Sequence, residues 1–156
     1  DVVSTLNSTR SWHAATNTAG EWLTMDLQVE TQVCGVVIQA SYSAKSYPTE
    51  IEVQYSPDNA QFTAVGTFWP DSTSNAYSQL PFAWPVNARY VKIVVKQFFG
   101  WPAMRAGVLH ECQVCSAGTF VCSNTSTKSA MCSICPAGKY LDTQLTLEYI
   151  YVASIR

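Results

Sequence analysis

The sequence predicts an all-β protein, in which a β-sandwich is followed by a small disulfide-rich C-terminal module. Between residues 22 and 112, short runs of β-branched and aromatic residues alternate with turn residues, and no segment keeps a helical apolar period. Several short strands at this spacing are typical of an antiparallel sandwich. Five of the six cysteines follow together, between residues 112 and 140.

Six segments are expected to form strands, because each is rich in strand-forming residues and is bounded by turns. In residues 51–55, apolar and polar side chains alternate with the period of two that marks a half-buried sheet. Pro57 presets the backbone of the turn that follows, residues 56–59. The expected strands are 22–27, 33–39, 51–55, 62–65, 89–95 and 106–110.

The chain divides into three parts. Residues 1–112 form the expected sandwich, whereas residues 113–140 contain almost no aliphatic residues and fold only if sulfur or metal cross-links them. Residues 141–156 return to an apolar alternating pattern, which predicts one more strand without indicating its partner.

Composition excludes several classes of function. Only 13% of the residues are charged, against about 25% in typical proteins, and the net charge is −2. No basic footprint for nucleic acid exists. Apolar runs such as residues 36–38 are far shorter than the ~20 residues of a membrane span, so no transmembrane segment is expected. No catalytic motif appears, and enzyme activity is not expected.

The cysteine spacing fits two kinds of cross-link. Cys112, Cys115, Cys132 and Cys135 form two Cys-x-x-Cys pairs, which suit either a zinc ribbon or disulfides. Cys122 has no role in a four-ligand zinc site, whereas an even number of cysteines can all pair. The spacing therefore favours disulfides, without excluding zinc.

The compartment follows from the cross-link. Asn7 and Asn124 begin glycosylation sequons, and the cysteine-rich segment has few of the basic residues that usually surround zinc knuckles. Both observations favour disulfides and an oxidising, extracellular setting.

The two histidines are His13 and His110, and the only possible ligands close to either are Glu111 and Cys112. These follow His110 along a strand, so that successive side chains point to opposite faces. No metal site or cofactor is expected, and a calcium requirement is left open.

The repeated Cys-x-x-Cys-[Ser/Pro]-Ala-Gly motif, at residues 112–118 and 132–138, resembles the cysteine-rich repeats of ephrin and tumour necrosis factor receptors. The resemblance implies a small module of disulfides, although six cysteines permit fifteen connectivities. The pairings that it implies are Cys115–Cys132 and Cys122–Cys135, which leaves Cys112 for Cys34.

The larger part contains six sequence blocks, at residues 11–12, 20–27, 33–39, 55–59 with Phe62, 88–93 and 104–112. In this order they resemble the discoidin, or coagulation factor V/VIII type C, domain. This resemblance implies a jelly-roll sandwich whose loops at one end bind a glycan, a phospholipid head group or a protein. Only ten residues precede the Ser11–Trp12 block, so the first strand is expected to be incomplete and the chain to belong to a longer polypeptide.

Asp26 and Arg89 match two family positions that resemble a partly buried ion pair tying two strands together. A structural role is expected for them, because a buried charge must be paired. On the same reasoning, a set of apolar residues is expected in the core. These residues are Trp22, Leu27, Val37, Tyr90, Ile93 and Leu109.

Two loops, residues 41–48 and 97–103, are expected at the ligand end. Their aromatic rings can stack on the apolar faces of pyranose rings, while polar neighbours take the sugar hydroxyls. The alternative is that one or two rings only plug the open end of the sandwich. The candidate ligand-binding residues are Tyr42, Lys45, Tyr47, Gln97, Phe98, Phe99 and Trp101.

Three functions fit these observations. The first is a carbohydrate-recognising adhesion module of a secreted or cell-surface protein. The second is binding to a phospholipid surface, for which only Lys45, Lys96 and Arg105 could supply positive charge near the loop tips. The third is an architectural role, in which the loops contact other proteins of a large extracellular assembly.

Overall fold

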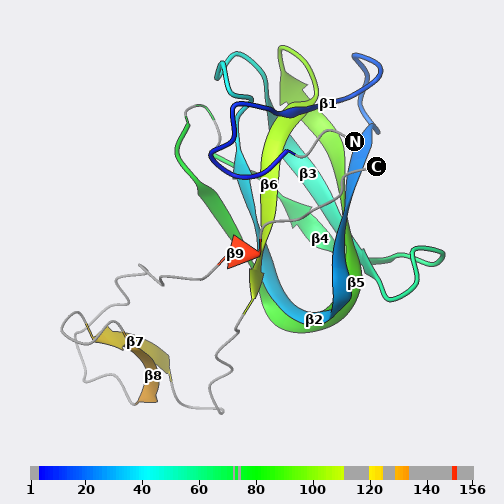
Figure 1. Ribbon diagram of the computed structural model, residues 1–156. Coiled ribbons are helices and arrows are strands. Elements are labelled where there is room, and N and C mark those ends of the chain that lie inside the picture. The colour runs from blue at the N-terminus through cyan, green and yellow to red at the C-terminus, as the bar shows by residue number, and fades with distance from the viewer. Residues whose placement is uncertain are drawn as a thin grey trace.

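The structure is a computed structural model that describes residues 4–71, 73 and 75–110 with their side chains, and the backbone of three strands beyond them. All the regular elements in these residues are strands, which confirms the all-β class (Figure 1). They are β1 (Trp12–His13), β2 (Trp22–Gln39), β3 (Tyr47–Ser56), β4 (Thr63–Phe68), β5 (Ser78–Phe99), β6 (Ala103–His110), β7 (Phe120–Asn124), β8 (Ser129–Ser133) and β9 (Tyr149–Ile150).

Strands β1 to β6 form one antiparallel sheet in the order β1-β6-β2-β5-β3-β4, and β9 pairs with β6. The first half of β2 pairs with the second half of β5, and the second half of β2 pairs with the first half of β5. The register shifts where both strands bend, which Figure 1 shows at one end of the sandwich. The sheet thus folds over into two layers. Strands β7 and β8 form a separate two-stranded sheet.

Two of the predicted boundaries are wrong. The strands expected at 22–27 and 33–39 are one bent strand, because the chain passes the bend with Gln28 in a left-handed conformation at φ 70°. The first half of β5 is absent from the prediction, because Pro81 and Pro85 interrupt its pattern. Proline is tolerated in a strand where no second partner needs its N–H. Among the described residues, the first half of β5 pairs with β2 alone, whereas its second half also pairs with β3.

The core lies between the layers and takes side chains from both. Leu23, Met25 and Ile93 are fully buried within it. Of the residues predicted in the core, Trp22 is instead 53% exposed and Tyr90 is only partly buried. Trp22 is exposed because successive side chains of a strand point to opposite faces. Leu23 and Met25 face inward, so Trp22 faces outward. The predicted burial of Leu27, Val37, Ile93 and Leu109 is confirmed.

A second apolar cluster contains Leu6, Val37 and Leu109, with Cys34 packed against it. Cys34 is disulfide-bonded. The side chains of the other cysteines lie outside the described residues, so the Cys34–Cys112 pairing stays a prediction. The same holds for the bonds predicted among Cys115, Cys122, Cys132 and Cys135, for the cysteine-rich repeat and for glycosylation at Asn124.

The two long strands leave no room for a side chain at Gly35. A Cβ atom there would lie 2.6 Å from the carbonyl oxygen of Leu80 and 2.9 Å from the Cα of Pro81, both of them backbone atoms. We expect Gly35→Ala to lower the free energy of unfolding by about 1–3 kcal/mol, because backbone cannot yield as a flexible side chain does. Chemical denaturation measures this. Val29→Ala, at an exposed position, is the control, and equal stability of the two variants would contradict the prediction.

Candidate ligand-binding site

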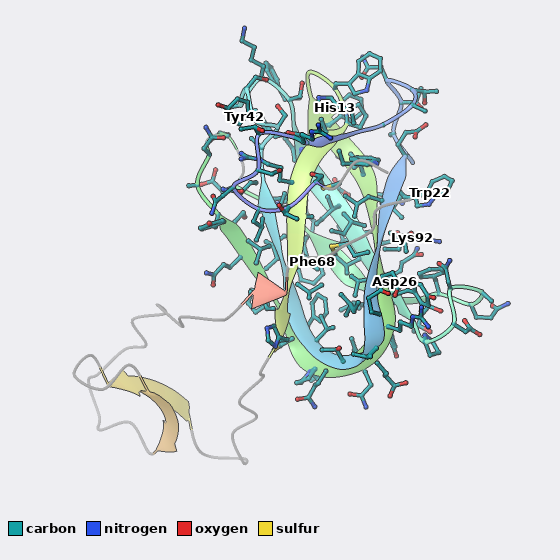
Figure 2. The ribbon with its side chains drawn as sticks, in the orientation of Figure 1. His13, Trp22, Asp26, Tyr42, Phe68 and Lys92 are labelled. Atoms are coloured by element: carbon teal, nitrogen blue, oxygen red, sulfur yellow. The ribbon has the colours of Figure 1, made fainter. Side chains whose placement is uncertain are left out.

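Three loops meet at the end of the sandwich opposite the bend (Figure 1). They are residues 14–21, 40–46 and 100–102, which follow β1, β2 and β5. The first and third are tied by two hydrogen bonds: the N–H of Ala14 donates to the carbonyl oxygen of Pro102 at 2.9 Å, and the indole Nε1 of Trp101 donates to that of Ala14 at 3.0 Å. Figure 2 places Tyr42 and His13 together at this end.

The second and third loops are in direct contact at Gly100. Its φ is +73°, and a Cβ atom there would lie 2.5 Å from the carbonyl oxygen of Lys45 and 2.9 Å from Oγ of Ser46. That Oγ accepts the backbone N–H of Trp101 at 3.2 Å. Glycine is the residue that tolerates both the left-handed backbone and the close approach. The two loops predicted at the ligand end therefore form one surface.

Aromatic side chains cover part of this surface. The ring of Phe99 is stacked on that of Tyr47, with centroids 5.3 Å apart and planes 20° apart. Phe99 is 59% exposed and Trp101 is 38% exposed, whereas Phe98 packs against the core. Phe98 thus plugs the end of the sandwich, whereas Phe99 and Trp101 present ring surface to solvent.

The predicted polar residues differ in how they are held. Gln97 is exposed, and its Nε2 donates to Oε2 of Glu50 at 2.7 Å. Tyr42 is 57% exposed, and its backbone N–H donates to Oγ of Ser11 at 2.7 Å. Lys45 is exposed and makes no hydrogen bond or ion pair with the residues described. Its ammonium group is therefore available to a ligand.

Arg105, on β6, organises the base of the loops. It is 3% exposed, and its guanidinium donates to the carbonyl oxygens of Ala40 and Ser8 at 2.9 and 3.2 Å and to Oδ1 of Asn75 at 2.6 Å. Burial lowers the pKa of Arg105, and this shift is partly offset by the nearby phenols of Tyr77 and Tyr42. The sequence signal for this role is one charge inside an apolar strand. The expected position of Arg105 at the loop tips is wrong, because its side chain is buried.

A buried amide completes this base. Gln39 is 1% exposed; its Oε1 accepts the backbone N–H of Asn7 at 2.8 Å, and its Nε2 donates to the carbonyl oxygen of Asn75 at 2.7 Å. The side chain of Asn7 accepts from Gln39 at 3.2 Å and donates to the hydroxyl of Tyr77. Asn7, where we predict glycosylation, is exposed and has a φ of 63°.

Of the three cations expected near the tips, two are engaged elsewhere. Arg105 is buried, and Nζ of Lys96 lies 3.2 Å from Oε2 of Glu52. The pKa of Glu52 is lowered, first by the hydrogen bond from Gln54 and then by that from Lys96. Lys45 is the remaining cation of that set.

The ion pair between Asp26 and Arg89 lies away from the loops. Nε and Nη2 of Arg89 lie 3.0 and 3.2 Å from the two carboxylate oxygens of Asp26, and the side chains are 41% and 23% exposed, respectively. These hydrogen bonds raise the pKa of Arg89. The pair joins β2 to β5 and has a structural role.

Within residues 4–71, 73 and 75–110, no group of three His, Cys, Asp or Glu side chains is placed to hold a metal ion. His13, at the loop end, bonds through Nδ1 to the carbonyl oxygen of Ser11 at 3.1 Å. The same residues include no helix that is long and apolar enough to cross a membrane.

Comparison with known sequences finds relatives of the larger part. The model of the F5/8 type C domain matches residues 3–108. Lactadherin of Mus musculus is 29% identical over 92 residues, which cover 54% of this chain and 20% of lactadherin. Lactadherin of Rattus norvegicus is 30% identical over 92 residues, covering 54% and 22%. The chain therefore spans about a fifth of the length of these relatives.

Three solved structures have the same fold. A CBM32 module from Clostridium perfringens in complex with GalNAc-β-1,3-galactose has a TM-score of 0.57 and 19% identity, with 68% of this chain and 80% of that one covered. Discoidin II from Dictyostelium discoideum has a TM-score of 0.57 and 15% identity, covering 71% and 45%. A pectin-binding carbohydrate-binding module has a TM-score of 0.54 and 18% identity, covering 72% and 81%.

Arg105 provides a test of how the loops are held. We expect Arg105→Lys to lower the free energy of unfolding by about 2 kcal/mol or more, because an ammonium group cannot reach all three acceptors and leaves buried oxygens unpaired. Thermal and chemical denaturation measure the loss. Lys96→Met, which removes an exposed cation, is the control and should stay within about 0.5 kcal/mol of the parent. A lysine variant as stable as the parent would show that Arg105 does not organise the loops.

Proposed function

The chain belongs to the F5/8 type C domain family, and from that premise we propose that it is a non-enzymatic module of an extracellular protein that binds glycans through the three loops. The observation that supports this proposal is the pair of exposed aromatic side chains, Phe99 and Trp101, on a surface that hydrogen bonds hold in place. Exposed rings on a rigid scaffold can stack on sugar rings without an ordering cost.

Each side chain of the site has a part in the proposal. The ring of Phe99, supported from behind by Tyr47, packs on the apolar face of a pyranose, and Trp101 bounds the site. The free amide oxygen of Gln97 accepts a sugar hydroxyl, while Lys45 donates to a hydroxyl or a carboxylate. The solved structures that share the fold include modules in complex with GalNAc-β-1,3-galactose and with 4,5-unsaturated mannuronic acid. Their ligands agree with a sugar as the class of ligand.

Phospholipid binding is the weaker alternative. Each basic residue near a membrane surface contributes about 1 kcal/mol, so that stable docking needs several of them. Arg105 is buried and Lys96 is paired with Glu52, which leaves Lys45 of the expected set. An architectural role would instead cover the rings of Phe99 and Trp101 with a neighbouring protein.

A glycan array with paired variants tests the proposal. We expect Phe99→Ala with Trp101→Ala to reduce glycan retention by more than about tenfold, because both stacking surfaces are removed. Trp84→Ala is the control, since Trp84 is 76% exposed and lies on the first half of β5. The Phe99→Ala single variant keeps the Trp101 hydrogen bonds, so it separates lost contacts from lost loop structure.

The outcomes are distinct. Unchanged retention in a folded double variant would remove the glycan function. Retention by vesicles that contain phosphatidylserine, together with an empty array, would favour the lipid alternative. Thermal denaturation of each variant establishes that it is folded.

A further inference from the structure

A second surface lies on the outer face of the layer formed by β2, β5, β3 and β4. Because Leu23 and Met25 face the core, Trp22, Thr24 and Asp26 face outward. The register places Thr24 and Gln54 on either side of Lys92, so that these three side chains form one row across three strands. Figure 2 shows Trp22, Lys92 and Asp26 along one flank of the molecule, apart from Tyr42 and His13 at the loop end.

The ammonium group of Lys92 lies between two aromatic rings. Its Nζ is 3.5 Å from the centroid of Phe62 and 5.9 Å from that of Trp22. A cation over a ring face is held by the charge distribution of the ring, which fixes the lysine without neutralising it. Trp22 is 53% exposed, so much of its indole remains open beside a positioned positive charge.

The cations of this face differ in whether a carboxylate neutralises them. Asp26 is paired with Arg89, and Glu52 with Lys96. The ammonium group of Lys92 makes no hydrogen bond or ion pair with any residue that the structure describes. Among these residues, the face thus offers one positioned cation that lacks an anionic partner.

We propose that this face is a second binding site, which takes an acidic polysaccharide built of uronic acid units. The open indole of Trp22 packs on the apolar face of one sugar ring, the ammonium of Lys92 pairs with a uronate carboxylate, and the hydroxyl of Thr24 bonds a ring hydroxyl. An extended sugar chain lies across the strands, because Thr24, Lys92 and Gln54 stand in one row on three neighbouring strands.

Two other occupants fit the face less well. A protein partner needs a compact apolar centre, but polar Thr24, Lys92 and Gln54 separate the two aromatic side chains. An anionic membrane needs several cations, and the other two, Arg89 and Lys96, already have carboxylate partners. The acidic polysaccharide is therefore the occupant to which we commit.

Binding to polygalacturonate tests the proposal, with fully methyl-esterified polygalacturonate as the uncharged ligand of the same backbone. All measurements use the full chain with Phe99→Ala and Trp101→Ala, so that the loop site contributes nothing and the second site is measured alone. Calorimetry or affinity electrophoresis gives the dissociation constants. We expect binding of polygalacturonate that weakens with salt, and binding of the ester at least about fivefold weaker.

Matched variants locate the site. Lys92→Met keeps the apolar stem on Phe62 and removes the charge, and we expect it to weaken polygalacturonate binding about threefold to fivefold. Trp22→Ala should weaken it about tenfold. Lys96→Met removes an equal charge from the same face, but that charge already has a partner in Glu52, so binding should stay within about twofold.

Several results would overturn the proposal. The first is that the loop-site variant does not bind polygalacturonate. The second is that it binds the methyl ester as tightly as polygalacturonate. The third is that Lys92→Met and Lys96→Met weaken binding equally. Binding of vesicles that contain phosphatidylserine in place of polygalacturonate would assign the face to a membrane. Because the loop site is disabled throughout, failure here leaves the proposed function at the loops untouched, and failure at the loops leaves this site untouched.

Discussion

The antiparallel pairing of β2 with β5 is the constraint on which the rest of the structure depends. Each strand belongs to both layers, so the pairing sets which residues face the core and where the chain leaves the sheet. Loops 40–46 and 100–102 follow the ends of these two strands and meet at one end of the sandwich. The same pairing turns Trp22 and Lys92 to the outside. One backbone arrangement thus creates both surfaces that we propose as binding sites.

The loop end is held by polar groups that the fold has removed from water. A buried cation costs several kcal/mol unless it is well paired, and Arg105 recovers this cost through carbonyl and amide oxygens from three separate segments. Gln39 joins two of these segments again. Arg105 thus anchors loop 40–46 through Ala40. Trp101 is bonded in turn to Ser46 of that loop and to Ala14.

The sequence was most informative where one local pattern decides the structure. The period of two in residues 51–55 and the discoidin motif blocks predicted the strands and the family, and both are confirmed. The sequence was least informative where contacts with residues distant in sequence determine the local structure. The bend that joins two predicted strands into β2 and the burial of Arg105 follow from register, which periodicity does not encode. The loops were predicted separately, but their contact at Gly100 appears only in three dimensions.

The first half of β5 has a consequence for how the molecule behaves at high concentration. Residues 82–85 stand opposite Cys34 alone, and Trp84 projects from this widened segment with 76% of its surface in water. An unpaired edge with an exposed tryptophan ordinarily invites strands from other molecules to add on. Pro81 precedes this segment and Pro85 ends it. Neither has a backbone N–H, so a strand from another molecule cannot form a continuous set of hydrogen bonds there. The prolines that obscured this strand in the sequence thus remove two of the N–H groups that an added strand would need.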